Sequence, residues 1–213
     1  GNQYDDYFIP RTEITTVLSD DGRFNLPVQI TYPQSFDSLK KYPVWVSIYG
    51  GPNAGTVYDR WRNLSGTYPW WAQEGLVQVI IDNRSSGHFG KTGINDIFRK
   101  LGLHETEDYL TAGRWLRRQP WADTSRIGIT GGSFGGYMTC MALTYGADVF
   151  THGLALAPVT DWQLYDTHYT ERYMDTPQEN PEGYSSTSVL NYISRYKGLL
   201  RIRSEEHTSE LQS

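Results

Sequence analysis

The stretch RIGITGGSFGGYMTCMAL, Arg126 to Leu143, decides the fold of this chain. A short apolar run typical of a strand leads into a glycine-rich turn, and a longer apolar run of helical character follows. The turn contains Gly131-Gly132-Ser133-Phe134-Gly135, the G-x-S-x-G pattern in which a serine stands on a sharp strand-to-helix corner. Glycines suit such a corner because the serine backbone is strained and its neighbours must approach closely. The pattern therefore predicts a nucleophile at Ser133.

Other interpretations of this stretch are an ordinary glycine-rich turn and a phosphate-binding loop. The second fails on its residues, because no G-x-x-x-x-G-K-[ST] occurs and the glycine spacing is not G-x-G-x-x-G. A metal-binding helix at HETED fails as well, because Asp108 stands where a zinc helix beginning at His104 needs its second histidine. The sequence implies no metal and no organic cofactor.

Strands and helices alternate on both sides of the corner, which indicates an α/β fold with a mostly parallel sheet covered on both faces. A helix is predicted over Glu105–Arg118, and Asp20-Asp21-Gly22 marks a hairpin. In such sheets function lies at the carboxyl ends of the strands. Further strands are predicted within YPVWVSIYGGP (42–52), LVQVIIDNR (76–84), THGLALAPV (151–159) and YKGLLRI (196–202). The residues just past strand ends are Tyr49, Asp82, Ser133 and Val159.

Composition narrows the class of protein further. The 213 residues suffice for one sizeable α/β domain and are too few for two. A net charge of −5 argues against a nucleic-acid-binding surface, which would need a basic face. The single cysteine, Cys140, excludes an intrachain disulfide, and its place in the predicted helix favours a buried, inert thiol.

Three stretches together carry a family resemblance: YPVWVSIYGGP, GGSFGGY and ALAPVTDWQLYDTHYTERYM (155–174). They closely resemble the catalytic domain of the prolyl oligopeptidase family of serine peptidases, in its dipeptidyl peptidase IV-like branch. The resemblance covers residues 26–202 and implies an α/β-hydrolase fold whose C-terminal strands are missing from this chain. One departure is the loop DNRSSGHFG, which carries serines where relatives often have glycines.

The resemblance also assigns roles to individual residues. Ser133 matches the nucleophile, and the backbone N–H of Phe134 together with the hydroxyl of Tyr49 matches the two donors of the oxyanion hole. For Trp162 and Tyr165, plain core packing is the alternative interpretation. The residues that match a hydrophobic pocket for a proline ring are Val159, Trp162, Tyr165 and Tyr169, with Phe134 packing on one side.

The acid and base of a catalytic triad are not evident in this chain. In an α/β-hydrolase they follow the serine, the acid after the next strand and the histidine one strand later. His152 enters a strand and His168 lies within the aromatic segment, so both are in the wrong place. We therefore expect the triad Asp and His to be absent from this chain and the 213-residue polypeptide to be inactive.

The resemblance and the tail composition predict three segments. Residues 1–25 are expected to be a tail and hairpin that follow a missing N-terminal β-propeller, and residues 26–202 a partial catalytic domain. Residues 203–213, RSEEHTSELQS, equal the in-frame translation of a common sequencing adapter, so we interpret them as an artefact. The alternative is an ordinary polar C-terminus.

For the parent protein the resemblance implies a serine dipeptidyl peptidase that removes X-Pro or X-Ala dipeptides through an acyl-enzyme. Peptides with proline or alanine second would be its substrates, with no nucleic-acid partner and no cofactor. A homodimer and a periplasmic, secreted or membrane-anchored location are suggested by the resemblance alone, which leaves the compartment open. The alternatives are another prolyl oligopeptidase-type peptidase, an esterase, or a non-catalytic binding protein on the same fold.

Overall fold

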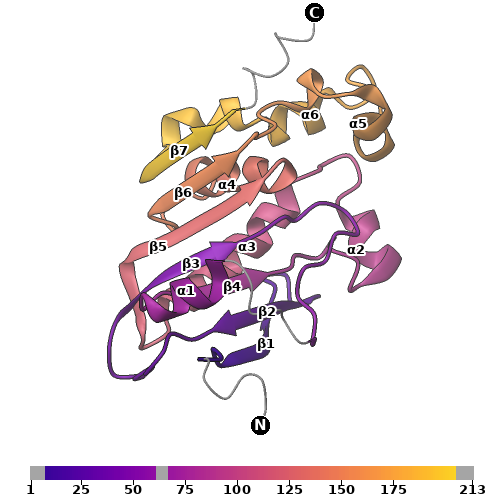
Figure 1. The fold of residues 1–213 in the computed structure, drawn as a ribbon. Coiled ribbons are helices and arrows are strands. Elements are labelled where there is room, and N and C mark those ends of the chain that lie inside the picture. The colour runs from indigo at the N-terminus through magenta and orange to yellow at the C-terminus, as the bar shows by residue number, and fades with distance from the viewer. Residues whose placement is uncertain (1–7, 61–66, 205–213) are drawn as a thin grey trace, which may run out of the picture.

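The strands of the chain form one sheet in a computed structural model that describes residues 8–60 and 67–204. In this described part the sheet has seven strands in the order β1-β2-β4-β3-β5-β6-β7 (Figure 1). The strands are β1 Thr12–Leu18, β2 Asn25–Thr31, β3 Tyr42–Ser47, β4 Val77–Ile81, β5 Ala122–Gly132, β6 His152–Leu156 and β7 Leu199–Arg203.

The sheet is mostly parallel, as predicted. Strands β4, β3, β5, β6 and β7 all run the same way, whereas β2 is antiparallel to both of its neighbours. The predicted hairpin is confirmed, because β1 and β2 pair across a turn in which Gly22 takes a positive φ of 71°. Since crossovers between parallel strands return to the same edge, the carboxyl ends of β3, β4, β5 and β6 lie side by side.

Helices cover both faces of the sheet, and none of the described ones is long and apolar enough to span a membrane. On one face α3 and α4 pack over the apolar rows that Val46 and Ile129 represent. On the other face Gln78 of β4 donates from Nε2 to the carbonyl of Tyr68 in α1, at 2.9 Å. The helices are α1 Thr67–Gln73, α2 Gly90–Asp96, α3 Leu103–Arg117, α4 Phe134–Thr144, α5 Thr167–Met174 and α6 Pro181–Thr187, with 3-10 helices η1 Trp162–Leu164 and η2 Val189–Arg195.

The predicted segment boundaries remain predictions. Strands β1 and β2 belong to the same sheet as the rest of the chain, and β2 spans the predicted boundary between residues 25 and 26. Arg203 ends β7, and its carbonyl accepts a hydrogen bond from the amide of Ala157 at 2.7 Å. Most of the predicted adapter-derived tail, residues 205–213, lies outside the described residues.

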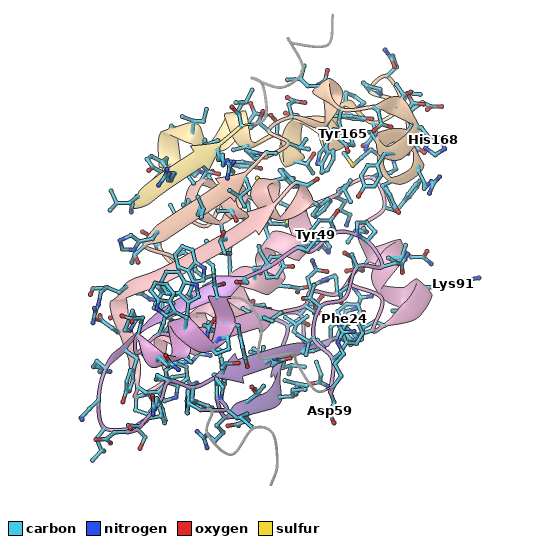
Figure 2. All side chains as sticks on the ribbon, in the orientation of Figure 1. Phe24, Tyr49, Asp59, Lys91, Tyr165 and His168 are labelled. Carbon is cyan, nitrogen blue, oxygen red and sulfur yellow. The ribbon has the colours of Figure 1, made fainter. Side chains whose placement is uncertain are left out.

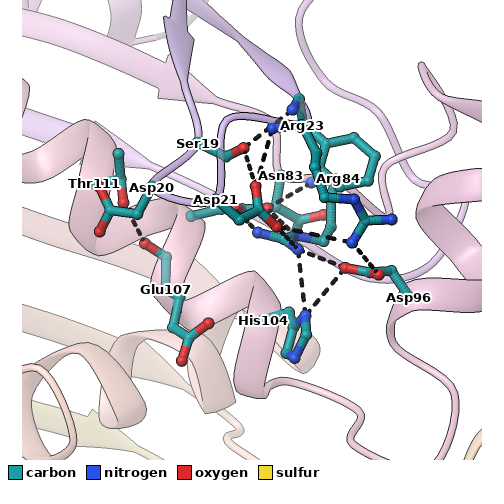
Figure 3. Close-up of polar contacts among 12 residues, drawn as sticks. Ser19, Asp20, Asp21, Arg23, Asn83, Arg84, Asp96, His104, Glu107 and Thr111 are labelled. Atoms are coloured by element: carbon teal, nitrogen blue, oxygen red, sulfur yellow. Dashed lines mark hydrogen bonds and ion pairs between the residues drawn. The ribbon is translucent and has the colours of Figure 1, made fainter.

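A buried arginine ties the hairpin to the helices (Figure 3). Arg84, whose side chain is 3% exposed, donates from Nε and Nη2 to the two carboxylate oxygens of Asp108, at 2.9 and 2.7 Å. Its Nη1 pairs with Asp21 of the hairpin turn and with Asp96 of α2. His104 joins the same group through Asp96, at 3.0 Å. We call these five residues the Arg84 cluster.

Replacing Arg84 by Met should destabilise the chain by about 3–5 kcal/mol, because it leaves the Asp108 carboxylate, 1% exposed, buried without its partner. Arg126→Met is the matched control: Arg126 is 56% exposed and pairs with Asp123 at the surface, so its loss should change the free energy of unfolding very little. Urea unfolding of both variants measures the difference. An equal change in the free energy of unfolding for both variants would show that the Arg84 cluster stabilises the chain no more than a surface ion pair does.

Candidate active site

The predicted serine corner is present at the junction of β5 and α4. Ser133 has φ 54° and ψ −116°, a strained conformation for a residue with a Cβ. Its amide donates to the carbonyl of Leu156 in β6 at 2.8 Å, which holds the corner against the neighbouring strand. The Ser133 side chain is exposed and makes no capping hydrogen bond to α4. The hydroxyl is therefore presented at the carboxyl edge of the sheet rather than used in the fold.

Close backbone contacts explain two of the corner glycines. A Cβ on Gly131 or on Gly135 would lie 2.6 Å from the carbonyl oxygen of Ile48, closer than any side chain tolerates. Gly132 differs, because a Cβ there would meet nothing nearer than 3.8 Å. The corner thus rests directly on the end of β3.

The same contact places Tyr49 beside the corner. Tyr49 follows Ile48 in the chain, and its ring centroid lies 6.5 Å from that of Phe134, the residue after Ser133. Tyr49 is 40% exposed, so part of it is open to solvent beside the corner. The amide of Phe134 belongs to the first turn of α4, where N–H groups have no acceptor within the helix. The two predicted oxyanion donors therefore come from segments that touch, and their catalytic role stays a prediction.

The predicted pocket residues form an aromatic wall, which we define as Phe134, Trp162, Tyr165 and Tyr169. The ring of Trp162 lies 5.5 Å from Phe134, 5.9 Å from Tyr165 and 6.1 Å from Tyr169, the last pair being stacked. Val159 is half-buried and packs against the same core. Figure 2 shows Tyr165 and Tyr49 at the same edge of the sheet.

Exposure separates the members of the aromatic wall. Trp162 is 1% exposed, and its Nε1 donates to the carbonyl of Leu101 at 3.1 Å, so it is a member of the wall that packs in the core. Tyr165 is 42% exposed and can contact a ligand. The alternative interpretation as core packing therefore describes Trp162 and does not describe Tyr165.

Sequence reasoning missed Tyr137, which packs against the buried side of the aromatic wall. Its ring lies 5.0 Å from Trp162 and 5.7 Å from Phe134, and its hydroxyl donates to the carbonyl of Thr187 at 2.8 Å. Burial raises the pKa of Tyr137 well above its usual range, so the phenol stays neutral and keeps donating. Its position three residues after Phe134, on the same face of α4, is the signal that could have found it.

A buried carboxylate anchors the loop that follows Tyr49. Asp82, at the end of β4, accepts hydrogen bonds from the amides of Thr56 and Val57 at 2.8 and 2.7 Å. It also accepts from the Thr56 hydroxyl at 2.7 Å and contacts His88 Nε2 at 2.8 Å. This carboxylate is 1% exposed and fully occupied, so its role is to hold the loop. Sequence analysis placed Asp82 at a strand end but found no partner for it.

Three of the four described histidines have polar partners other than Ser133. His88 contacts Asp82, His104 contacts Asp96, and His152 contacts Thr151 at 2.8 Å. His168 is exposed on α5 and lies on the outside of the molecule in Figure 2. Among residues 8–60 and 67–204, no histidine is hydrogen-bonded to the Ser133 hydroxyl and no cluster of three His, Cys, Asp or Glu side chains could hold a metal.

Glu105, in the first turn of α3, is a fully buried acid. Its Oε2 accepts from the amide of Gly102 at 2.9 Å, while Oε1 has no hydrogen-bond partner within the described part of the chain. Burial raises the pKa of Glu105 to about 8, because the charged form loses its hydration. Gly102, with φ 100°, is the N-cap of α3, which begins at Leu103, two residues before the predicted start. The thiol of Cys140 is also buried, which raises its pKa to about 12, in line with the predicted inert thiol.

A mostly parallel sheet in this strand order, with a strained serine between β5 and its following helix, defines an α/β-hydrolase fold. Comparison with known proteins agrees. The family model described as "Prolyl oligopeptidase family" matches residues 62–208. The chain belongs to the prolyl oligopeptidase family.

Individual relatives point to one branch of that family. "Probable dipeptidyl-aminopeptidase B" of Ajellomyces capsulatus is 38% identical over 185 residues, covering 86% of this chain and 20% of the relative. The solved dipeptidyl peptidase 4 of Porphyromonas gingivalis is 37% identical with a TM-score of 0.87, covering 93% of this chain and 28% of that one.

A solved structure from Bacteroides ovatus, described as a "putative dipeptidyl aminopeptidase IV", is 38% identical with a TM-score of 0.89. The match covers 100% of this chain and 31% of the Bacteroides chain. The chain spans about a fifth of the length of the curated relatives it matches.

Relief of the corner strain gives a first test of this site. Ser133→Gly should be about 1 kcal/mol more stable than Ser133→Ala, because only glycine takes a φ of 54° without cost. Both variants remove the hydroxyl, so the comparison isolates the backbone. Thermal or urea unfolding measures it, and equal stability of the two variants would contradict a strained corner.

The pKa of Glu105 gives a second test. The folded chain binds a proton on Glu105 up to about pH 8, whereas the unfolded chain releases it near 4.5, so stability should fall as pH rises between these values. Glu105→Gln should remove this fall, flattening the slope by about 1 kcal/mol per pH unit. Urea unfolding at several pH values checks the difference. Parallel curves for the two proteins would show that the acid is not held neutral.

Proposed function

We propose that this chain is the catalytic part of a longer serine peptidase that removes dipeptides from peptide N-termini when proline or alanine is second. The observation that carries the proposal is the meeting of an exposed, strained Ser133 with Tyr49 and the aromatic wall at one edge of the sheet. The dipeptidyl peptidase names of its relatives support the same activity.

In this proposal Ser133 Oγ attacks the carbonyl carbon of the second residue of the substrate. A general base outside the described residues takes the hydroxyl proton and passes it to the leaving amine as the peptide bond breaks. Water then hydrolyses the acyl-enzyme. The amide of Phe134 and the hydroxyl of Tyr49 stabilise the oxyanion that forms in each step.

The aromatic wall accounts for the preference at the second residue. A pyrrolidine ring is flat, rigid and apolar, so Tyr165 and Tyr169 can enclose it without leaving a buried polar group unpaired. Burial raises the pKa of Tyr169, as do the phenols of Tyr173 and Tyr49 beside it, which keeps this surface neutral. An uncharged wall favours proline and alanine over charged side chains.

The test uses the full-length protein that contains this chain, assayed with Gly-Pro-nitroanilide, Ala-nitroanilide and an acyl ester. We expect Gly-Pro-nitroanilide to be preferred, Ser133→Ala to abolish its hydrolysis, and Tyr49→Phe to lower kcat by about 10²–10³. Preference for the ester would indicate an esterase instead. Binding of peptide without turnover by the wild-type protein would indicate a non-catalytic relative.

A further inference from the structure

A buried amide holds the turn that follows Tyr49. Asn83, next after Asp82 at the end of β4, is 0% exposed. Its Nδ2 donates to the carbonyl of Gly50 at 2.9 Å and lies 3.2 Å from the hydroxyl of Tyr109 in α3. A side chain of one strand thus reaches across to the backbone beyond the end of its neighbour, next to the proposed oxyanion donor.

The hydrogen bonds of the side-chain oxygen fix the orientation of the Asn83 amide. Asn83 Oδ1 accepts from the amide of Ser85 at 2.7 Å and from the Ser85 hydroxyl at 2.9 Å. Two donors therefore face the oxygen, and the carbonyl of Gly50 faces the nitrogen. Only an amide in this orientation satisfies all three groups.

The turn itself has no freedom to move without breaking these contacts. Gly50 has φ 80°, and a Cβ on it would lie 2.5 Å from the Tyr109 hydroxyl and 3.1 Å from Asn83 Nδ2. A Cβ on Gly51 would lie 2.8 Å from the ring of Tyr49. The backbone of Gly50, which follows Tyr49, is therefore packed directly on Asn83 and Tyr109. The Tyr49 ring lies against the backbone of Gly51.

We propose that Asn83 is a positioning residue for the oxyanion hole: by holding the Gly50 carbonyl, it sets the direction in which Tyr49 presents its hydroxyl to the carbonyl attacked by Ser133. This inference rests on the proposed function. A donor stabilises an oxyanion only if it is aimed at that position before the reaction begins. Asn83 acts through Tyr49 and does not itself touch substrate.

The decisive variant is Asn83→Asp in the full-length protein. It preserves shape but sets a carboxylate oxygen against the Gly50 carbonyl, so the turn should shift away. We expect kcat for Gly-Pro-nitroanilide to fall about tenfold or more with KM within about twofold, because the lost interaction exists only in the transition state. Asn191→Asp, an exposed asparagine whose Nδ2 donates to the carbonyl of Ser185, is the matched control and should leave kcat unchanged.

A double-mutant cycle separates positioning from general damage. In a Tyr49→Phe background, Asn83→Asp should cost little further activity, because the hydroxyl that it positions is gone. An equal loss of kcat in both backgrounds, or a loss confined to KM, would overturn the proposal. Asn83→Ala removes the donor without adding charge and gives the same readout if the aspartate variant fails to fold.

Hydrogen exchange on the full-length protein tests the positioning independently of activity. Asn83→Asp should speed exchange in residues 49–56, which include the amide of Asn53 bonded to Ser85 at 2.8 Å, and leave α4 unchanged. Unchanged exchange in this segment would overturn the proposal. If the full-length wild-type protein shows no peptidase activity, the proposed function fails, while the exchange result still decides the role of Asn83 in the turn.

Discussion

The approach of two backbones at Ile48 is the constraint on which this structure depends. The carbonyl of Ile48 leaves no space for a Cβ at Gly131 or Gly135. Only glycines at these positions therefore let the corner between β5 and α4 pack against the end of β3. That contact puts Tyr49 next to Phe134 and so next to Ser133. The strain at Ser133 persists because pairing of β5 with both of its neighbours leaves the chain no other path.

Three consecutive residues after β4 hold three different segments in place at the carboxyl edge of the sheet. Asp82 holds the loop at Thr56, Asn83 holds the turn at Gly50, and Arg84 binds the aspartates of the hairpin and helices. All three side chains are buried and polar, which is costly unless each is satisfied, as these are. The edge is therefore fixed by hydrogen bonds and ion pairs where a loop alone would be mobile.

Much of the fold could be predicted from local sequence patterns. Alternation and glycine turns sufficed for the strands, the hairpin and the serine corner, because each depends on neighbours in sequence. The aromatic wall was found through family resemblance, which left pocket lining and core packing open for Trp162, since exposure depends on what η1 packs against. Tyr137 and Asn83 escaped notice because their partners, Thr187 and Gly50, lie far away in sequence. Glu105 and His88 have partners nearby in sequence, but their burial and contacts depend on how the chain folds around them. The roles given to Ser133, Tyr49 and Val159 stay predictions.

Pairing of β3 with β5, in which Val46 lies opposite Ile129, has a consequence for how the chain folds. The strands that carry Tyr49 and Ser133 are joined by a long connection containing α1, β4, α2 and α3, so their pairing is a non-local contact of high entropic cost. Such contacts form late and slowly. Ser133 and Tyr49 therefore come together only when the centre of the sheet is complete, which makes their proximity a marker of finished folding rather than of any local element.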